Sequence, residues 1–142
     1  MKILLAVDGS KHSLDAVDNM IGHAGWYRAK PAVELLTVHL PVPKLPNMSL
    51  VVGKNQIERY YREEGEAMQA AAKKKLDAAG IRYNASILVG PIAETIVAYA
   101  KKANCDLISI GTHGRSATGK LLLGSVASKL TQLSSIPVLV VR

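Results

Sequence analysis

The chain has 142 residues, a length that fits one compact domain, and 49% of them are hydrophobic, which argues against disorder. Phe is absent and Trp occurs once, so the core must be built from aliphatic side chains, as in a central sheet covered by helices. No apolar run approaches the roughly 18 residues of a membrane span, and the first run stops at Asp8, too early for a signal peptide. We therefore expect a cytoplasmic protein that does not enter a membrane.

The net charge of +7 raises the question of a nucleic-acid partner. Apart from Lys73-Lys74-Lys75, however, the basic residues are scattered and do not alternate with aromatic ones. This argues against a nucleic-acid partner and for a solvated surface that attracts anionic ligands.

The single cysteine, Cys105, excludes an internal disulfide and a multi-cysteine metal site. Its position at an expected helix–strand junction favours a packed thiol over a reactive one.

The first half of the chain predicts two strands and two helices. A continuous apolar run over residues 2–7 indicates a buried strand, and Ser10 is a suitable N-cap for a helix that extends to about Gly25. Residues 33–40 form the second strand. A loop rich in proline follows at residues 41–53, and a long helix covers residues 55–79, with Gly80 as its left-handed C-cap.

The second half continues the alternation. Residues 83–89 predict a third strand at an edge of the sheet, and Gly90-Pro91 starts a helix that Asn104 ends. Residues 107–110 form the fourth strand, a helix starts near Gly124, and a final strand covers residues 138–141. Strands that alternate with helices, joined by connections long enough for right-handed crossovers, predict one α/β domain over residues 1–142 with a doubly wound parallel sheet and helices on both faces.

The most informative stretch is DLISIGTHGRSATGKLLLGSV, residues 106–126. A buried strand there leads into a loop of small residues that opens a helix. Glycines allow a close backbone approach to a ligand, and a helix start offers N–H groups without partners and a partial positive charge. In doubly wound sheets, ligands bind at this carboxyl edge of the strands, so we expect the loop to hold the phosphates of a nucleotide.

Two other nucleotide-binding motifs can be set aside. Residues 114–121 have the order G-x-x-x-x-G-K-L, but Leu121 lacks the hydroxyl that a Walker A loop uses to hold Mg²⁺. The helix also begins beyond that lysine, near Gly124. A G-x-G-x-x-G fingerprint of dinucleotide-binding domains follows none of the predicted strands.

The spacing that is present is Gly111-x-x-Gly114, nine residues, then Gly124-Ser125. With this motif the sequence resembles the ATP-binding branch of the universal stress protein family. The resemblance covers the whole chain and includes ILLAVDGS at residues 3–10, LLTVHL at 35–40, IGTHG at 110–114, LLGSVA at 122–127 and PVLVVR at 137–142. It implies a five-stranded sheet in the order 3-2-1-4-5, as in adenine nucleotide alpha hydrolase-like folds, and bound ATP with Mg²⁺ or Mn²⁺ carried by the phosphates.

The resemblance also implies roles for individual residues. Asp8 matches the acidic residue beside the ribose and adenine, and Val38 matches the residue whose backbone meets the adenine. The remaining positions match the residues around the ribose and phosphates: Gly111, His113, Gly114, Arg115, Gly124, Ser125 and Val126. Among them, His113 and Arg115 are neighbours of the loop glycines. Lys120 is a further candidate for a phosphate contact. Asp8 could instead serve only the turn that follows the first strand.

The sequence leaves three functional classes open. No pair of acid and base is visible beside the loop, and no second carboxylate is placed to hold Mg²⁺, so we favour a regulatory nucleotide-binding protein of the stress response. The alternatives are a weak ATPase or nucleotidyl-transfer enzyme on the same site, and a nucleotide-independent dimeric interaction protein.

The apolar last strand leaves an edge that must be covered. The resemblance implies a homodimer through this strand, which consists of Val138, Leu139, Val140 and Val141.

Overall fold

The computed structural model describes residues 1–43, 53–114 and 123–142. Its strands are β1 (Lys2–Ala6), β2 (Ala32–His39), β3 (Tyr83–Val89), β4 (Leu107–Gly111) and β5 (Val138–Val141). Its helices are α1 (Lys11–Gly22), α3 (Lys54–Ala78), α4 (Ile92–Lys102) and α5 (Ser125–Leu133), with a short 3₁₀ helix, η1 (Ala24–Trp26). The predicted number and order of strands and long helices are confirmed.

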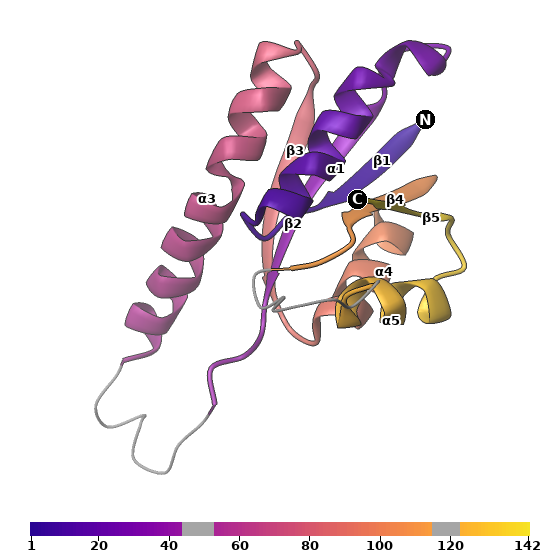
Figure 1. Cartoon of the computed structure of the whole chain (residues 1–142). Coiled ribbons are helices and arrows are strands. Elements are labelled where there is room, and N and C mark those ends of the chain that lie inside the picture. Colours follow the sequence, from indigo (N-terminus) through magenta and orange to yellow (C-terminus); the bar gives the residue numbers. More distant parts are fainter. Residues whose placement is uncertain (44–52, 115–122) are drawn as a thin grey trace.

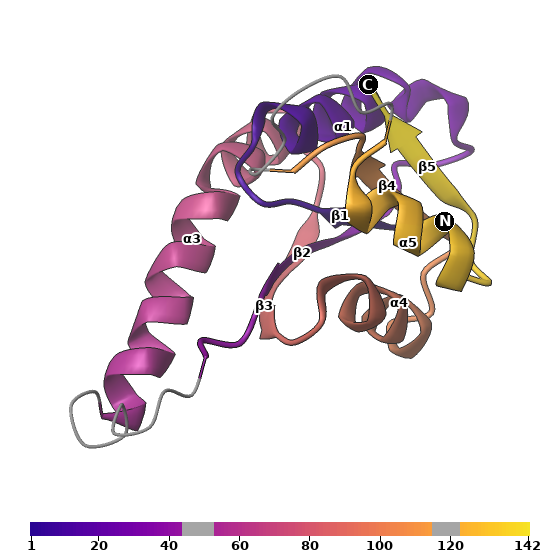
Figure 2. The same ribbon diagram turned by 60° about the horizontal axis from the view of Figure 1, so that its bottom comes forward.

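The sheet is parallel throughout and has the order β3-β2-β1-β4-β5, with β3 and β5 at its edges. Helices α1 and α3 pack together on one face of the sheet, and α4 and α5 pack together on the other (Figures 1 and 2). The doubly wound α/β fold in the order 3-2-1-4-5 is therefore confirmed. The proline-rich loop is largely outside the described residues, which resume at Gly53.

Strand β1 runs through the centre of the molecule, and its side chains alternate between two cores. Ile3 and Leu5 belong to the cluster under α1 and α3, whereas Leu4 and Ala6 belong to the cluster under α4 and α5. All four are buried, which explains why this strand is a continuous apolar run rather than an alternating one. None of the helices in the described part of the chain combines the length and apolar character that a membrane span requires.

Local sequence signals set several helix ends. The Ser10 side chain accepts the Ser13 N–H at 3.3 Å, as the N-cap prediction requires. At the end of α3, Gly80 has φ +62° and the Ile81 N–H bonds the Leu76 carbonyl at 3.0 Å, so the predicted left-handed cap is present as a Schellman motif. Asn104, with φ +52°, ends α4 in the same way.

Helix α1 is shorter than predicted, because it ends at Gly22 and not near Gly25. The Asn19 carbonyl accepts both the His23 backbone N–H at 3.0 Å and the His23 ring nitrogen Nδ1 at 2.7 Å. The chain then tightens into η1, where the Trp26 N–H bonds the His23 carbonyl at 2.9 Å. The apolar pattern continued through this turn, so it could not indicate the change of helix type.

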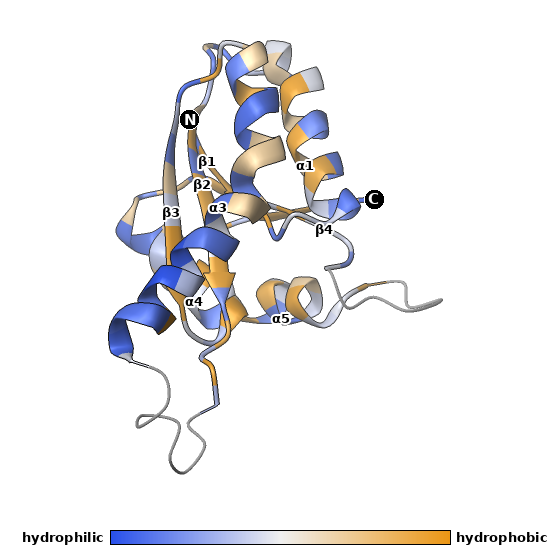
Figure 3. Cartoon of the chain, turned by 90° about the vertical axis from the view of Figure 1, so that its left-hand side faces the viewer, coloured by the Kyte–Doolittle hydropathy of each residue, from blue (hydrophilic) through white to orange (hydrophobic). Residues whose placement is uncertain are grey.

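Helix α3 extends well beyond the sheet. Its 25 residues span about 37 Å, against about 23 Å for the seven residues of β3. Its buried residues all lie at or beyond Gly65, near the middle of the helix: Gly65, Gln69, Ala72 and Leu76. The first half projects past the ends of β2 and β3 and is largely hydrophilic (Figure 3). At the point of departure from the sheet, the Tyr61 hydroxyl accepts the Val42 N–H at 2.6 Å.

The contact between α3 and β3 depends on Gly65. A Cβ at this position would lie 2.7–2.8 Å from three side-chain carbons of Ile87, so the helix touches the strand with its backbone. Nearby, the buried Gln69 side chain donates to the Ser86 carbonyl at 2.8 Å. Together these contacts explain a glycine in the interior of a helix, where it ordinarily costs about 1 kcal/mol relative to alanine.

Replacing Gly65 by Ala should lower the free energy of unfolding by about 1–2 kcal/mol, because overpacking against Ile87 exceeds the gain in helix propensity. Urea titration monitored by circular dichroism measures this change. In an Ile87→Ala background the cost of Gly65→Ala should shrink. Gly22→Ala is the control: it faces open space and should be neutral or stabilising. Equal costs of Gly65→Ala in the two backgrounds would refute the contact.

Candidate functional site

A pocket lies where the chain connections diverge, at the carboxyl ends of the central strands β1 and β4. The connection after β1 leads toward β2, and the connection after β4 leads toward β5 on the other side. The helix that starts after each strand therefore moves away, and the strand ends stay uncovered. The pocket holds about 270 Å³, close to the lower end of the roughly 300–1,000 Å³ range for small-molecule sites.

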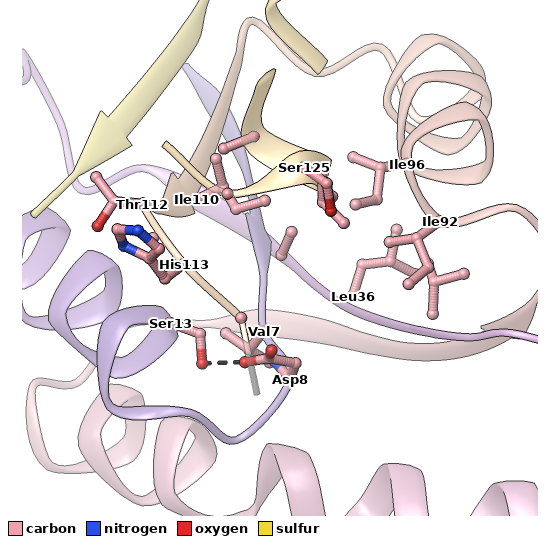
Figure 4. A pocket seen from close by; sticks show the side chains of 17 residues that line it. Val7, Asp8, Ser13, Leu36, Ile92, Ile96, Ile110, Thr112, His113 and Ser125 are labelled. Carbon is pink, nitrogen blue, oxygen red and sulfur yellow. Dashed lines mark hydrogen bonds between the residues drawn. The ribbon is translucent and has the colours of Figure 1, made fainter. Parts of the chain in front are cut away.

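The turn after β1 fixes the carboxylate of Asp8 at the pocket. Asp8 Oδ1 accepts the Ser10 N–H at 3.0 Å. The Asp8 N–H donates to Ser13 Oγ at 3.4 Å, and Asp8 and Ser13 lie side by side in Figure 4. Ser13 is buried and also donates to the Ser10 carbonyl at 2.9 Å. Gly9, with φ +77°, completes the turn in a conformation that favours glycine. The predicted structural role of Asp8 in the turn is thus present, together with a place in the pocket.

The end of β4 makes direct backbone contact with the start of α1. A Cβ on Gly111 would lie 2.3 Å from the His12 carbonyl oxygen and 2.9 Å from the Ser13 nitrogen. This approach brings the ring of His113 to the ring of His12, with centroids 5.2 Å apart. Thr112, the residue between Gly111 and His113, is 7% exposed. Its hydroxyl has no hydrogen-bond partner among the described residues.

Helix α5 begins at the pocket and presents its amino end there. The Gly124 N–H donates to the Thr112 carbonyl at 2.6 Å, which ties the helix start to the end of β4. Helix geometry leaves the next N–H groups, those of Ser125, Val126 and Ala127, without an intrahelical acceptor. No side chain in the described part of the chain caps this end. These three residues line the pocket, so their positive helix end faces it.

The opposite part of the pocket is apolar. Its side chains come from β2, β4 and α4: Leu36, Val38, Ile110, Ile92 and Ile96 (Figure 4). The pocket thus combines aliphatic walls with Asp8, Thr112, His113 and the amides at the start of α5. A ligand that combines a flat apolar group with an anion fits this combination.

Eight of the nine residues predicted for the site line this one pocket: Asp8, Val38, Gly111, His113, Gly114, Gly124, Ser125 and Val126. The ninth, Arg115, lies outside the described residues, as does Lys120. The roles of individual residues toward a ligand stay predictions. Two of the glycines nonetheless have a clear packing reason, since a Cβ on Gly111 or Gly124 would lie 2.9 Å or less from backbone atoms of the protein itself.

The sequence did not indicate the apolar wall from α4 or two hydroxyls of the pocket. Ile92 and Ile96 fall within the helix predicted between Gly90 and Asn104, and nothing in the sequence placed them, Ser13 or Thr112 in a site. Leu36 could have been found, because it lies two residues before Val38 on the same face of the strand. The wall from α4 had no comparable signal, since residues that face a pocket and residues that face a core share the same helical spacing.

Fold and pocket together define a doubly wound α/β domain with a pocket at its topological switch point. Residues 1–142 match the universal stress protein family. The chain belongs to this family, and the resemblance seen in its motifs is confirmed.

The chain is 32% identical over 141 residues to universal stress protein MJ0531 of Methanocaldococcus jannaschii, an alignment that covers 99% of this chain and 81% of that protein. The solved structure of MJ0577 from the same organism superposes with a TM-score of 0.82 at 29% identity, covering 99% of this chain and 94% of that one. A universal stress protein crystallised in complex with cAMP has a TM-score of 0.70 at 24% identity, covering 100% and 97% of the two chains.

Gly111→Ala should destabilise the protein by about 3–5 kcal/mol or prevent folding, because its Cβ would meet backbone atoms of α1 that cannot move alone. Gly114→Ala is the matched comparison. Among the described residues, its Cβ would meet Asp8 Oδ2, at 2.9 Å. This is a side-chain atom that can shift by a few tenths of an ångström without moving backbone, so we expect a loss below about 1 kcal/mol. Denaturant unfolding of both variants measures the difference, and similar losses would contradict the assignment of Gly111 to packing.

Proposed function

We propose that this protein is an ATP-binding regulatory protein of the stress response, whose nucleotide-bound state is recognised by partners. The observation that carries the proposal is the amino end of α5, whose N–H groups have no intrahelical acceptor and line the same pocket as the apolar walls of β2 and α4. The first feature suits phosphate oxygens and the second suits a purine ring. Membership of the universal stress protein family and the cAMP complex of a related fold support a nucleotide ligand.

The phosphates would lie at the junction of β4 and α5. The N–H groups of Ser125, Val126 and Ala127 can donate to phosphate oxygens, and so can the Ser125 hydroxyl. The buried Thr112 hydroxyl, which has no partner in the described part of the chain, would gain one. The Gly124 N–H is already bonded to Thr112, so we assign Gly124 to shaping the loop rather than to donating.

The adenosine moiety would lie on the side of β2 and α4. Leu36, Val38, Ile92 and Ile96 provide an apolar slot for the base, and Asp8 can accept hydrogen bonds from ribose hydroxyls. No group of three or more His, Cys, Asp and Glu side chains in the described residues could hold a metal ion. We therefore propose that Mg²⁺ or Mn²⁺ is bound through the phosphate oxygens of the nucleotide.

We place this function in the cytoplasm. The chain has one cysteine, and Cys105 is a buried free thiol whose pKa is raised above its usual value, first by burial and then by the nearby Glu34 carboxylate. A thiol that stays protonated is inert and suits a reducing compartment.

Gly114→Val tests the nucleotide site. The branched side chain would enter the pocket beside Asp8, so we expect the affinity for ATP to fall by more than about tenfold while the fold persists. Calorimetric titration with MgATP measures the affinity, and circular dichroism checks the fold. Wild-type protein should also melt at temperatures that rise with ATP concentration. Gly25→Val, at an open position of η1, is the control and should bind normally. An unchanged affinity in Gly114→Val would count against the proposal.

We also propose that the protein is a homodimer formed through β5. Among the described residues, β5 is paired on one side alone, with β4, and it ends the sheet. The Ile108 N–H bonds the Pro137 carbonyl and the Thr112 N–H bonds the Val141 carbonyl, so by alternation the backbone groups of Val138 and Val140 point outward. Leu139 is 39% exposed beside them. An apolar edge with outward N–H and C=O groups is suited to pairing with a second copy.

Val140→Pro should convert the dimer into a monomer, because it removes an outward N–H and leaves the ladder to β4 intact. Sedimentation velocity at micromolar concentration gives the mass of wild type and variant. A wild-type monomer under these conditions would overturn the proposed dimer, and a dimeric Val140→Pro variant would exclude this edge as the interface.

A further inference from the structure

A buried carboxylate lies on the same strand as the apolar wall of the pocket, at the end away from it. Glu34 of β2 is 5% exposed. Its Oε2 accepts the Tyr99 hydroxyl at 2.9 Å, its Oε1 accepts the Asn84 side-chain amide at 3.1 Å, and Lys2 Nζ lies 3.7 Å from Oε1. A charge removed from water requires such partners, and here they come from β1, β3 and α4.

Tyr99 is the only one of these partners on a helix. Its hydroxyl also lies 3.0 Å from Ser86 Oγ on β3. Burial raises the pKa of Tyr99 above its ordinary value, and the Glu34 carboxylate raises it further, so the phenol keeps the proton that it donates. Lys2 Nζ donates to the carbonyl of Ala103, the C-cap of α4, at 2.8 Å. The carboxyl-terminal half of α4 is thus fixed to the sheet by polar contacts.

The same two elements form the two apolar walls of the pocket. Along β2, Leu36 and Val38 follow Glu34 at steps of two residues, or about 6.6 Å. Along α4, which runs in the opposite direction, Ile96 and Ile92 precede Tyr99 by three and seven residues, so they follow at steps of about 4.5–6 Å. Leu36, Ile92 and Ile96 lie together in the pocket (Figure 4).

Helix α4 therefore faces β2 at three levels. The level farthest from the pocket is the hydrogen bond between Tyr99 and Glu34. The other two levels are apolar and border the pocket. The apolar levels are held by non-directional packing, which tolerates sliding and rotation of a helix. The hydrogen bond is directional and fixes both the rotation of α4 about its axis and its distance from β2.

We propose that Tyr99 and Glu34 are positioning residues for the base: their hydrogen bond sets the width of the slot between β2 and α4 and so its selectivity for a flat purine ring. This assignment rests on the proposed nucleotide function. The phosphate part of the site lies on β4 and α5 and does not include this contact. Loosening α4 should therefore weaken recognition of the base and leave recognition of the phosphates unchanged.

The experiment compares three probes on the intact chain: ATP, adenosine and inorganic tripolyphosphate, each titrated by calorimetry. Tyr99→Phe keeps the ring and removes the hydroxyl. We expect its affinities for ATP and adenosine to fall roughly five- to tenfold, and its affinity for tripolyphosphate to stay within about twofold of wild type. Glu34→Gln retains an oxygen that can accept the Tyr99 hydroxyl, so it should bind all three probes nearly as wild type does.

Tyr60→Phe, at a half-exposed position of α3, is the matched control and should leave all three affinities unchanged. A merely structural Tyr99 would lower the melting temperature of Tyr99→Phe without changing the ratio of adenosine to tripolyphosphate affinity, and that result overturns the assignment. An equal loss for all three probes overturns it as well. If Tyr99→Phe does not fold, Glu34→Leu provides the same comparison. Failure of the wild-type protein to bind ATP or adenosine overturns the proposed function itself and, with it, this assignment.

Discussion

The site depends on the direct backbone contact between the end of β4 and the first turn of α1. Gly111 allows the strand to approach the His12 carbonyl so closely that no side chain fits between them. This contact places the turn containing Asp8 beside Thr112 and His113, although about a hundred residues separate the two segments. The Thr112 carbonyl then holds the start of α5 through Gly124. Three segments are thereby fixed by main-chain contacts, which position groups more tightly than flexible side chains do.

The sequence predicted those features that are determined by neighbouring residues. The Ser10 cap, the left-handed Gly80 and the apolar run of β1 each have a local physical cause, and the structure contains all of them. The edge position of β3 is also as expected. The end of α1 was placed too late, because the His23 ring nitrogen bonds a carbonyl of the helix and no pattern of apolar residues indicates such a bond.

The glycines show why the site was only partly predictable. A glycine indicates that something lies close to the backbone, but the sequence does not say whether that is a ligand or the protein itself. The prediction assigned Gly111 and Gly124 to a ligand. The structure places protein backbone against both, and both also line the pocket, so their role toward a ligand stays a prediction. The wall from α4 was missed for a related reason. Ile92 and Ile96 follow the spacing of core residues, and only the tertiary arrangement distinguishes a residue that borders a pocket from one that is sealed inside.

The pocket draws its apolar and polar groups from different elements of the fold. Apolar side chains come from β2 and α4, whereas the main-chain N–H groups come from the start of α5, after β4. The charge of the protein suits this arrangement. Its net +7 attracts anionic ligands over distances of about a Debye length, although the basic residues are not gathered into one patch.

The overhang of α3 separates two regions that tolerate change differently. From Gly65 onward the helix is buried against the sheet, so its spacing cannot vary without disturbing Ile87 and Ser86. The earlier turns contribute no buried side chain. Insertions, deletions and charge reversals there alter the outline of the molecule but not its core. Related chains can therefore diversify at this end of the helix while the pocket, built on other elements, keeps its shape.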